Sequence, residues 1–245
     1  MTSEVDTRPE SPMQHVTLSL FRFDTPARRL WALAQMGLSR MALARVPGLS
    51  FFKLCGSGTG EGFTPRPNWS VWAILGVWDS PEAARTGMAG GIYARWRARA
   101  CESWSVALEP FSARGRWSGV APFTPQGAAD TGPLAALTRA SLKPSRAARF
   151  WARVPDISLG VGANPDVLFK IGIGEVPFLH QVTFSIWPDV ARMNAFARTG
   201  PHAAAIRAVR DEGWFAEDLY ARFRIVGSEG TWQGRDPLAQ QPEAA

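Results

Sequence analysis

The spacing of hydrophobic residues in the first half of the chain alternates between strand-like and helix-like patterns. Residues 16–20 alternate apolar and polar side chains, which is typical of a half-buried strand. After Pro26, apolar residues recur with helical spacing and predict a helix with one apolar face, the kind of face that packs on a core. That face consists of Leu30, Trp31, Leu33, Ala34 and Leu38. The same criteria predict strands at 49–54, 69–78 and 106–117, and a helix from 79 to about 104.

The second half repeats this order of elements. Its predicted elements are strands at 134–140, 167–173, 181–187 and 220–226, and helices that begin at Ser145 and at Asp189, the latter ending near Trp214. Short motifs also recur in the same order. Phe52-Lys53-Leu54 returns as Phe169-Lys170-Ile171, and GRWSG at 115–119 returns as GTWQG at 230–234. Collinear matches of this kind indicate an internal duplication.

Each half therefore has the element order β-α-β-β-α-β, which is that of a ferredoxin-like module. We predict an α+β fold in which two tandem ferredoxin-like units face each other within one chain, in the manner of a dimeric α/β barrel. The predicted parts are a disordered N-terminal extension at 1–14, a first repeat at 15–119, a linker at 120–132, a second repeat at 133–234 and a C-terminal tail at 235–245.

Composition and charge narrow the classes of function. The chain has 11 Trp and 14 Phe but only 2 Tyr, and rings without hydroxyl groups suit a large apolar pocket as well as a core. The formal net charge of +6 suits an anionic membrane surface or an acidic electron donor, and it is too small for a nucleic-acid-binding tail. With no apolar run of spanning length, no signal peptide and two Cys, we expect a cytoplasmic protein without disulfides.

Motifs for several kinds of chemistry are absent from the sequence. The glycine-rich segment at 56–62 lacks the spacing of a phosphate- or dinucleotide-binding loop, so we expect a flexible loop at the mouth of the barrel. The three His residues lack metal-ligand spacing, and no G-x-S-x-G motif occurs. What remains is a binding protein or an enzyme whose chemistry belongs to a cofactor.

Two histidines are candidates for holding such a cofactor. His202 lies in the last predicted helix, on the same face as Ile206, and the matching position of the first repeat is apolar. His180, directly before a predicted strand, is the second candidate. The alternative interpretations are a core or N-cap role for His202 and a plain loop position for His180.

Basic residues recur at matching strand positions, where charge is unexpected. These pairs are Arg22 with Arg139 and Lys53 with Lys170. They bind a cofactor carboxylate, or else they pair with an acidic residue across the sheet or extend their charged ends into solvent at its edge. Both interpretations stay open at this point.

Four long segments carry a resemblance to a known family. They are VTLSLFRF at 16–23, PGLSFFKLCGSGTGEGFTPRPNWSVWAIL at 47–75, RWSGVAPFTP at 116–125 and LFKIGIGEVPFLHQVTFSIW at 168–187. These segments resemble the spheroidene monooxygenases of purple phototrophic bacteria. The resemblance covers nearly the whole chain from Met13 onward. The residues before Met13 do not match the family, so we expect an extension or an upstream start codon there.

The resemblance implies an acyclic carotenoid 2-ketolase. Such enzymes use O2 and electrons from reduced ferredoxin to oxidise C-2 of spheroidene and hydroxyspheroidene, and the family is thought to carry haem. Two successive hydroxylations of one carbon give a gem-diol that loses water to the ketone. A haem iron suits a chain whose side chains cannot themselves oxidise a C–H bond, and a long polyene gives the aromatic excess a role in lining a tunnel.

The resemblance also implies partners and a location. We expect the carotenoid substrate and ferredoxin as partners, peripheral contact of a cytoplasmic protein with the photosynthetic membrane, and no nucleic acid. A homo-oligomer stays an open alternative.

The fold expectation suggests the axial ligand of the haem. Haem proteins of the dimeric α/β-barrel type take a His from a helix of the haem-binding half, here expected to be the second repeat. This favours His202 over His180, and a thiolate from Cys55 or Cys101 is a minor alternative. Further residues expected to contact the cofactor are Arg207, Lys170 and Arg139.

Tryptophans divide into repeated and unrepeated ones. The repeated pairs, expected in the core, are Trp78 with Trp187, Trp104 with Trp214, and Trp117 with Trp232. The unrepeated ones, expected to line the substrate pocket, are Trp69, Trp72 and Trp96.

Two other functions compete with the ketolase. One is a haem peroxidase or chlorite-dismutase-like protein, which would share the barrel and handle small polar oxidants. The other is a carotenoid carrier without a metal. An absorption spectrum separates the carrier from the haem proteins, and product analysis separates ketolase from peroxidase.

Overall fold

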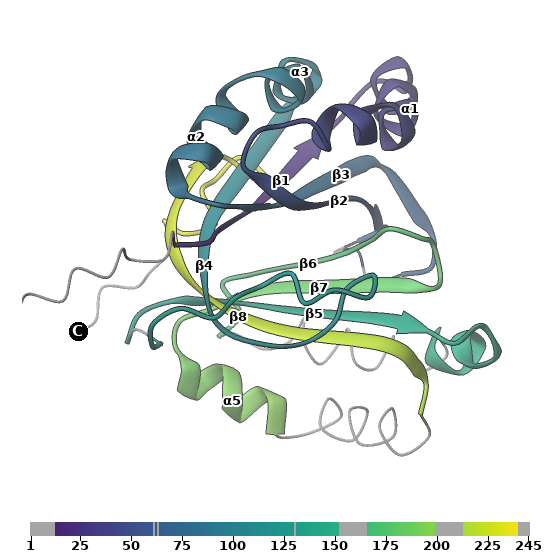
Figure 1. Cartoon of the computed structure of the whole chain (residues 1–245). Coiled ribbons are helices and arrows are strands. Elements are labelled where there is room, and N and C mark those ends of the chain that lie inside the picture. Colours follow the sequence, from purple (N-terminus) through teal and green to yellow (C-terminus); the bar gives the residue numbers. More distant parts are fainter. Residues whose placement is uncertain are drawn as a thin grey trace, which may run out of the picture.

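Eight antiparallel strands close into a barrel in this computed structural model of the chain (Figure 1). The structure describes residues 13–60, 62, 64–129, 131–151, 166–198 and 213–239. The strands are β1 (His15–Arg22), β2 (Leu49–Gly58), β3 (Pro67–Trp78), β4 (Glu102–Gly115), β5 (Leu134–Leu142), β6 (Phe169–Gly174), β7 (His180–Trp187) and β8 (Phe215–Gly230). The helices are α1 (Pro26–Leu43), α2 (Pro81–Ala89), α3 (Gly91–Arg99) and α5 (Val190–Arg198), and residues 144–151 are also helical.

The strand order around the barrel is β1-β3-β2-β6-β7-β5-β8-β4. Each half of the chain therefore contributes four neighbouring strands, and in each half their order across the sheet is fourth, first, third, second. The predicted α+β barrel is confirmed. The helices of the first half lie outside the barrel, over β1, β2 and β3 (Figure 1).

The two seams between the halves differ in length. At one seam β4 pairs with β8 over eleven residue pairs, from Trp104 with Gly230 to Gly115 with Leu219. At the other, β2 pairs with β6 over only two, Gly56 with Gly174 and Ser57 with Ile173. A strand edge that leaves most of its backbone groups without a ladder partner is the easier place to open a barrel. The β2–β6 seam is thus the weak side of the closure.

Alternate side chains of all eight strands fill the barrel interior. The six repeated tryptophans are all buried, as expected: Trp78, Trp104, Trp117, Trp187, Trp214 and Trp232. The segments at 115–119 and 230–234 also share one backbone course. Gly115 and Gly230 have φ of 92° and 88°, and Ser118 and Gln233 have φ of 55° and 58°.

Helix α1 begins where the sequence predicts, but it presents the opposite face to the core. The Thr25 side chain accepts a hydrogen bond from the backbone N–H of Arg28, and Pro26 occupies the first turn. The buried residues of α1 are Ala32, Ser39 and Leu43. Of the predicted core face, Leu30, Leu33 and Leu38 are instead exposed, whereas Trp31 is half-buried and packs against the core. The prediction fails because α1 carries apolar residues on both faces, so spacing alone does not identify the inner one.

Three other expectations need correction. The single helix predicted from 79 to 104 is two helices that meet at Gly91, whose φ of 55° interrupts the first, and Trp104 lies in β4. The loop predicted at 56–62 is shorter, since β2 continues to Gly58. Trp214 lies outside any helix.

Lys53 and Lys170 are not equivalent positions. Lys53 pairs with the interior residue Leu75, whereas Lys170 pairs with Ser185, whose neighbours Phe184 and Ile186 point inward. The register of β2 shifts between Leu49 and Phe51, and a one-residue shift moves a side chain to the other face of a sheet.

Among the described residues, no helix has the length and the apolar composition that a membrane-spanning segment needs.

Candidate functional site

Three cavities border the β2–β6 seam. The first, of about 450 Å³, includes Ser57 and Ile171 in its lining; the second, of about 250 Å³, includes Gly56 and Ile173; the third, of about 390 Å³, includes Lys53. These three cavities therefore lie at the seam where the barrel has the fewest strand pairings. We consider the seam the candidate site.

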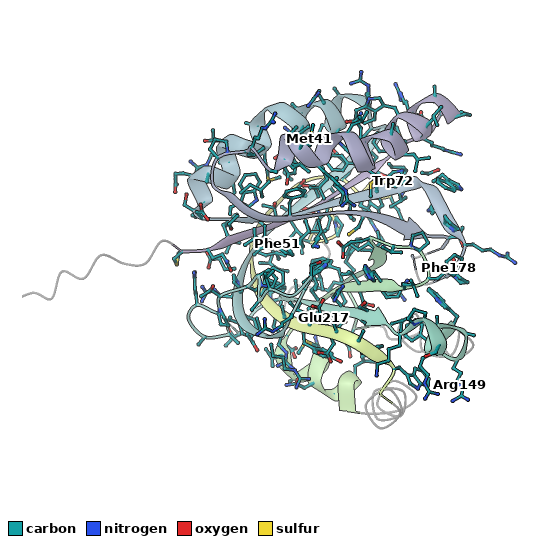
Figure 2. All side chains as sticks on the ribbon, turned by 45° about the vertical axis from the view of Figure 1, so that its right-hand side comes forward. Met41, Phe51, Trp72, Arg149, Phe178 and Glu217 are labelled. Atoms are coloured by element: carbon teal, nitrogen blue, oxygen red, sulfur yellow. The ribbon has the colours of Figure 1, made fainter. Side chains whose placement is uncertain are left out.

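The second cavity is an apolar groove, here called the aromatic groove. Its aromatic and aliphatic lining residues are Leu33, Met36, Trp69, Trp72, Trp151, Val176 and Phe178. Trp72 and Phe178 lie on the same side of the molecule (Figure 2). The Trp72 indole N–H donates to the Trp69 carbonyl over 2.9 Å, which fixes the ring. The groove can take one end of a long apolar molecule, since its volume is below that of a pocket that encloses a whole one.

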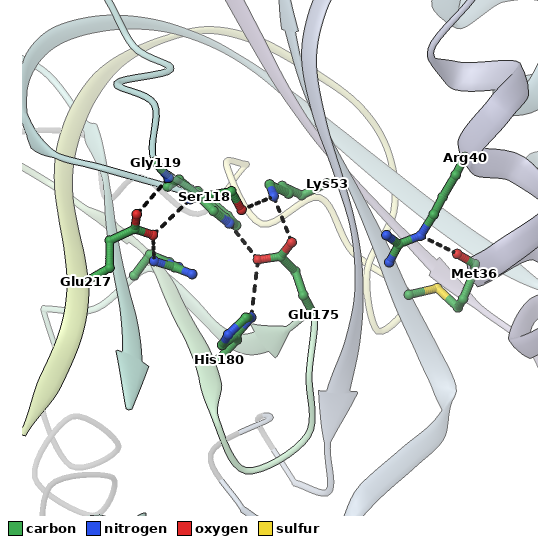
Figure 3. Close-up of polar contacts among 10 residues, drawn as sticks. Met36, Arg40, Lys53, Ser118, Gly119, Glu175, His180 and Glu217 are labelled. Carbon is green, nitrogen blue, oxygen red and sulfur yellow. Dashed lines mark hydrogen bonds and ion pairs between the residues drawn. The ribbon is translucent and has the colours of Figure 1, made fainter. Parts of the chain in front are cut away.

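Charged side chains meet where the groove reaches the barrel end, in what is here called the mouth cluster (Figure 3). Its members are Lys53, Trp117, Arg139, Glu175, His180 and Glu217. Glu175, in the turn between β6 and β7, is the centre. Its carboxylate accepts a hydrogen bond of 2.6 Å from the Trp117 indole and pairs with the Lys53 ammonium at 2.9 Å. Lys53 also donates to the Ser118 hydroxyl over 2.7 Å.

Glu217 organises the other half of the cluster. Its carboxylate accepts hydrogen bonds from the backbone N–H groups of Ser118 and Gly119 over 2.8 and 2.7 Å, and it pairs with the buried Arg139. Although desolvation opposes the change, the two backbone hydrogen bonds and Arg139 lower the pKa of Glu217. The matching pair at the other end of the barrel is Arg22 with Glu102, at 3.2 Å. Both arginines therefore do what the second interpretation predicted and pair with an acidic residue.

His180 belongs to both the groove and the cluster. Its Nδ1 lies 3.7 Å from a Glu175 oxygen, without a hydrogen bond. Burial is the main cause that lowers its pKa, and Arg139 acts in the same direction against the opposing Glu175 charge. At neutral pH the imidazole is therefore neutral, which leaves a ring nitrogen able to accept a proton or bind a metal.

The outer faces of the two sheets carry different side chains. Over the first sheet the helices pack on large apolar residues that include Phe21, Leu54, Trp72, Ile74 and Trp78. The middle of the same face on the second sheet carries small and polar residues, and the residues between them along each strand point into the barrel. These small and polar residues are Ala136, Thr138, Ala140, Lys170, Gly172, Gln181, Thr183 and Ser185. At one end of this face, Leu134 and Trp187 pack with Met193 in an apolar cluster. The middle of the face therefore offers hydrogen-bonding groups and little side-chain bulk.

The predicted site residues fall into three groups. His202 and Arg207 lie outside the described residues. His180, Trp69 and Trp72 line the aromatic groove together. Trp96 lies apart from them, fully buried between α1, α3 and the first sheet against Phe21 and Phe23, and lines none of the three cavities.

Arg139 and Lys170 do not come together. Arg139 shares a face of β5 with the interior residue Leu137, and Lys170 lies on the outer face of β6. One cofactor cannot contact both from one side of the sheet. Cys55 is buried, and desolvation raises the pKa of its thiol, which disfavours the thiolate that a metal needs; Cys101 is exposed.

Glu175 and Glu217 are residues of the candidate site that the sequence did not indicate. Both are isolated carboxylates without a motif. A signal for them existed, because a charged residue at an inward strand position such as Lys53 or Arg139 requires a counter-charge nearby. The sequence did not reveal which carboxylate supplies it.

Comparisons with known proteins give one clear group of relatives. No family model matches the chain. It is 56% identical over 234 residues to the spheroidene monooxygenase of Rhodobacter capsulatus, a match that covers 94% of this chain and 97% of that protein. It is 55% identical over 232 residues to that of Cereibacter sphaeroides, covering 93% and 72%, and 37% identical over 233 residues to that of Rubrivivax gelatinosus, covering 94% and 90%.

Solved structures of aldoxime dehydratase share the fold. One has a TM-score of 0.59 at 12% identity and covers 88% of this chain and 82% of its own. A complex of the enzyme with butyraldoxime has a TM-score of 0.60 at 11% identity, covering 88% and 80%. At such identities the likeness concerns the fold alone.

Proposed function

The chain belongs to the spheroidene monooxygenase family, and from this membership we propose that it introduces a keto group at C-2 of spheroidene and hydroxyspheroidene. The observation that carries the proposal is an identity of 55–56% to two relatives of that name over nearly the whole chain. The aromatic groove supports it, because ring faces pack well on a conjugated hydrocarbon.

The reaction needs an oxidant and electrons that side chains do not supply. Each of two hydroxylations at C-2 consumes one O2, two electrons and two protons and releases one water, and the gem-diol then loses water to give the ketone. We propose haem as the cofactor and reduced ferredoxin as the electron donor. When bound, haem supplies the O2 chemistry that breaks the C–H bond.

The middle of the outer face of the second sheet supports this choice of cofactor. Alanine at 136 and 140 adds little bulk beside the strands, and Thr138, Thr183 and Lys170 offer polar groups toward the same side. Lys170 is the residue suited to a haem carboxylate. The corresponding outer face of the first sheet differs, because it carries the large apolar residues Trp72, Ile74 and Trp78, which pack with the helices.

We propose His202 as the axial ligand and keep His180 as its alternative. His202 belongs to the half of the chain whose sheet fits the cofactor. In favour of His180 is Glu175, since ligating histidines commonly have a carboxylate beside the second ring nitrogen. Arg207 is proposed to support the haem together with His202.

The described residues have defined roles in this proposal. Trp69 and Trp72 hold the polyene end by ring contact. The apolar lining of the groove excludes water from it. Neutral His180, at the junction of groove and mouth cluster, can accept and return a proton at a ring nitrogen, and the Glu175 carboxylate that pairs with Lys53 lies 3.7 Å from its Nδ1.

We also propose that the barrel consists of two ferredoxin-like repeats, with a linker at 120–132. The shared strand order and the equal backbone course at 115–119 and 230–234 support the duplication. So do the matching pairs Arg22 with Glu102 and Arg139 with Glu217.

Product analysis tests the function. Purified protein with haem, reduced ferredoxin and O2 is given spheroidene, and the pigments are separated and identified. The proposal predicts the 2-oxo carotenoid. Recovery of unchanged spheroidene under these conditions, with haem present in the protein, would contradict it.

A further inference from the structure

Large apolar side chains on the surface are concentrated around the aromatic groove. Among the described residues, ten large hydrophobic side chains are exposed, and seven of them lie on α1 or in the groove lining. These seven are Leu30, Leu33, Leu38, Met41, Trp69, Val176 and Phe178. A contiguous exposed apolar patch on a soluble fold marks a contact with another molecule or with a membrane.

The members on α1 form one stripe. Leu30, Ala34, Gly37 and Met41 follow one another at intervals of four, three and four residues, so they form a line along the helix. Leu33 and Leu38 flank that line. The stripe lies opposite Ala32, Ser39 and Leu43, through which α1 packs on the barrel. Its side chains are thus free of any core role.

The stripe ends at the groove. Leu33 and Met36 of α1 line the groove together with Trp69 and Phe178, which reach it from β3 and from the turn after β6. Figure 2 shows Met41 on the helix layer and Phe178 at the turn below it. A molecule that rests on α1 therefore has the groove entrance at its surface.

The charges within α1 and directly after it are of one sign, and Asp24 just before the helix pairs with Arg28 at 3.0 Å. Between residues 26 and 45 the chain has four arginines and no acidic residue. These are Arg28, Arg29, Arg40 and Arg45. Arg40 and Arg45 are exposed near the C-terminal end of α1. An apolar helix face bordered by arginines, with a tryptophan at its edge, is the pattern of a helix that lies in the interface of an anionic bilayer.

We propose that α1, with Trp69, Val176 and Phe178, docks on the surface of an anionic lipid bilayer and places the aromatic groove at that surface. The inference rests on the proposed function, because a carotenoid dissolved in the bilayer is what gives the docked groove its use. The polyene can then pass from the lipid into the groove without crossing water. The contact is interfacial, since α1 keeps its inner face on the barrel.

Vesicle flotation of the full-length protein tests the docking. The probes are phosphatidylcholine vesicles with and without phosphatidylglycerol, free of carotenoid. The test variant is Leu30→Glu/Leu38→Glu, whose two side chains are 67% and 69% exposed. The control is Val226→Glu, an exposed apolar residue on β8, 47% exposed and remote from α1. Arg45→Glu tests the charge separately, and thermal unfolding checks that each variant is folded.

The expected outcome is binding of the wild type to anionic vesicles and weaker binding to neutral ones. The double variant should partition at least about ten-fold less, since each substitution removes an apolar side chain from the contact. Arg45→Glu should weaken binding to anionic vesicles only, and Val226→Glu should bind as the wild type does. Failure of the wild type to float, or undiminished binding of a folded double variant, would overturn the proposal.

Conversion of spheroidene in detergent micelles separates this proposal from the function. The double variant should convert micellar substrate at the wild-type rate and lose turnover on vesicle-borne substrate. If the wild type floats but converts neither form, the function fails and the docking stands. If it converts micellar substrate but does not float, the docking alone fails.

Discussion

The indole N–H of Trp117 donates a hydrogen bond of 2.6 Å to the carboxylate of Glu175. Trp117 follows the last strand of the first half, and Glu175 lies in a turn of the second half, so this bond joins the halves beside the β2–β6 seam, where the strands share only two residue pairs. Lys53 completes the link from β2. The mouth cluster thus supports the barrel where its backbone pairing is weakest.

Glu175→Gln should destabilise the fold by about 1–3 kcal/mol. The substitution leaves the Lys53 ammonium, only 14% exposed, without its counter-charge. Urea unfolding at neutral pH measures the change. The matched control is Glu82→Gln, which removes an ion pair with Arg85 whose partners are largely exposed; it should cost less than about 0.5 kcal/mol. Equal losses in the two variants would show that the cluster adds nothing to the seam.

Glu217 should make stability depend on pH in the acidic range. Its pKa is lower in the folded protein than its ordinary value of 4.5, so the unfolded chain binds the proton more readily. The stabilisation is therefore fully present above about pH 4.5 and is lost as the pH falls through the lowered folded-state pKa. The difference in unfolding free energy between the wild type and Glu217→Gln should shrink from neutral pH to pH values below that range. A pH-independent difference would exclude this role.

Phe178→Ala should raise the KM for micellar carotenoid about two- to ten-fold with little change in stability. The ring is half exposed and lines the groove, so its loss removes a contact with the polyene and little packing. Steady-state kinetics and thermal unfolding measure the two effects.

Trp96→Phe should have the opposite effect, a loss of stability without a change in KM. This side chain is fully buried and distant from the groove lining, so the variant should lose about 1–3 kcal/mol of stability and keep its KM. A raised KM in Trp96→Phe with an unchanged KM in Phe178→Ala would place the substrate between α1 and the first sheet instead.

Gly115→Ala and Gly230→Ala should destabilise the protein to the same degree. Both residues have φ near 90°, and an added Cβ would lie 2.2 Å from a backbone oxygen of the partner strand, that of Asp218 or of Ser103. Each substitution should cost about 1–3 kcal/mol. Gly119→Ala has a positive φ but meets no atom, and it should cost less. Clearly unequal losses at 115 and 230 would argue against equivalent repeats.

His202→Ala should abolish the Soret band of the purified protein together with its activity, because the proposal makes this residue the axial ligand. His180→Ala should keep the band and lower turnover. The reverse result would move the ligand to His180 and to the Glu175 side of the barrel.

The barrel could be predicted from the sequence because the duplication is visible in motifs that repeat in order. Trp69 and Trp72 could be found because they interrupt that repetition. The inward face of α1 could not be predicted, since Leu30 and Leu38 are as apolar as the residues that do pack inside. Tertiary contact, and not periodicity, decides between two apolar faces of one helix.

Shifts of one residue in strand register prevented the prediction of further site residues. The irregular pairing after Leu49 moves Lys53 to the interior while Lys170 stays outside, and the matching motifs FKL and FKI conceal this. Glu175 could not be found from the sequence either, because its role comes from Trp117 and Lys53, residues 58 and more positions away in the chain.

Oxidation of C-2 of an acyclic carotenoid with molecular oxygen is the activity that we propose for this chain. The most direct measurement supplies the haem-loaded protein with spheroidene, reduced ferredoxin and oxygen-18 gas, and analyses the pigment by mass spectrometry with a water-exchange control. We expect a 2-oxo carotenoid whose ketone carries the heavy isotope and which does not form without reduced ferredoxin. Product formation that depends on added peroxide, or bound carotenoid that stays unoxidised, would contradict this proposal.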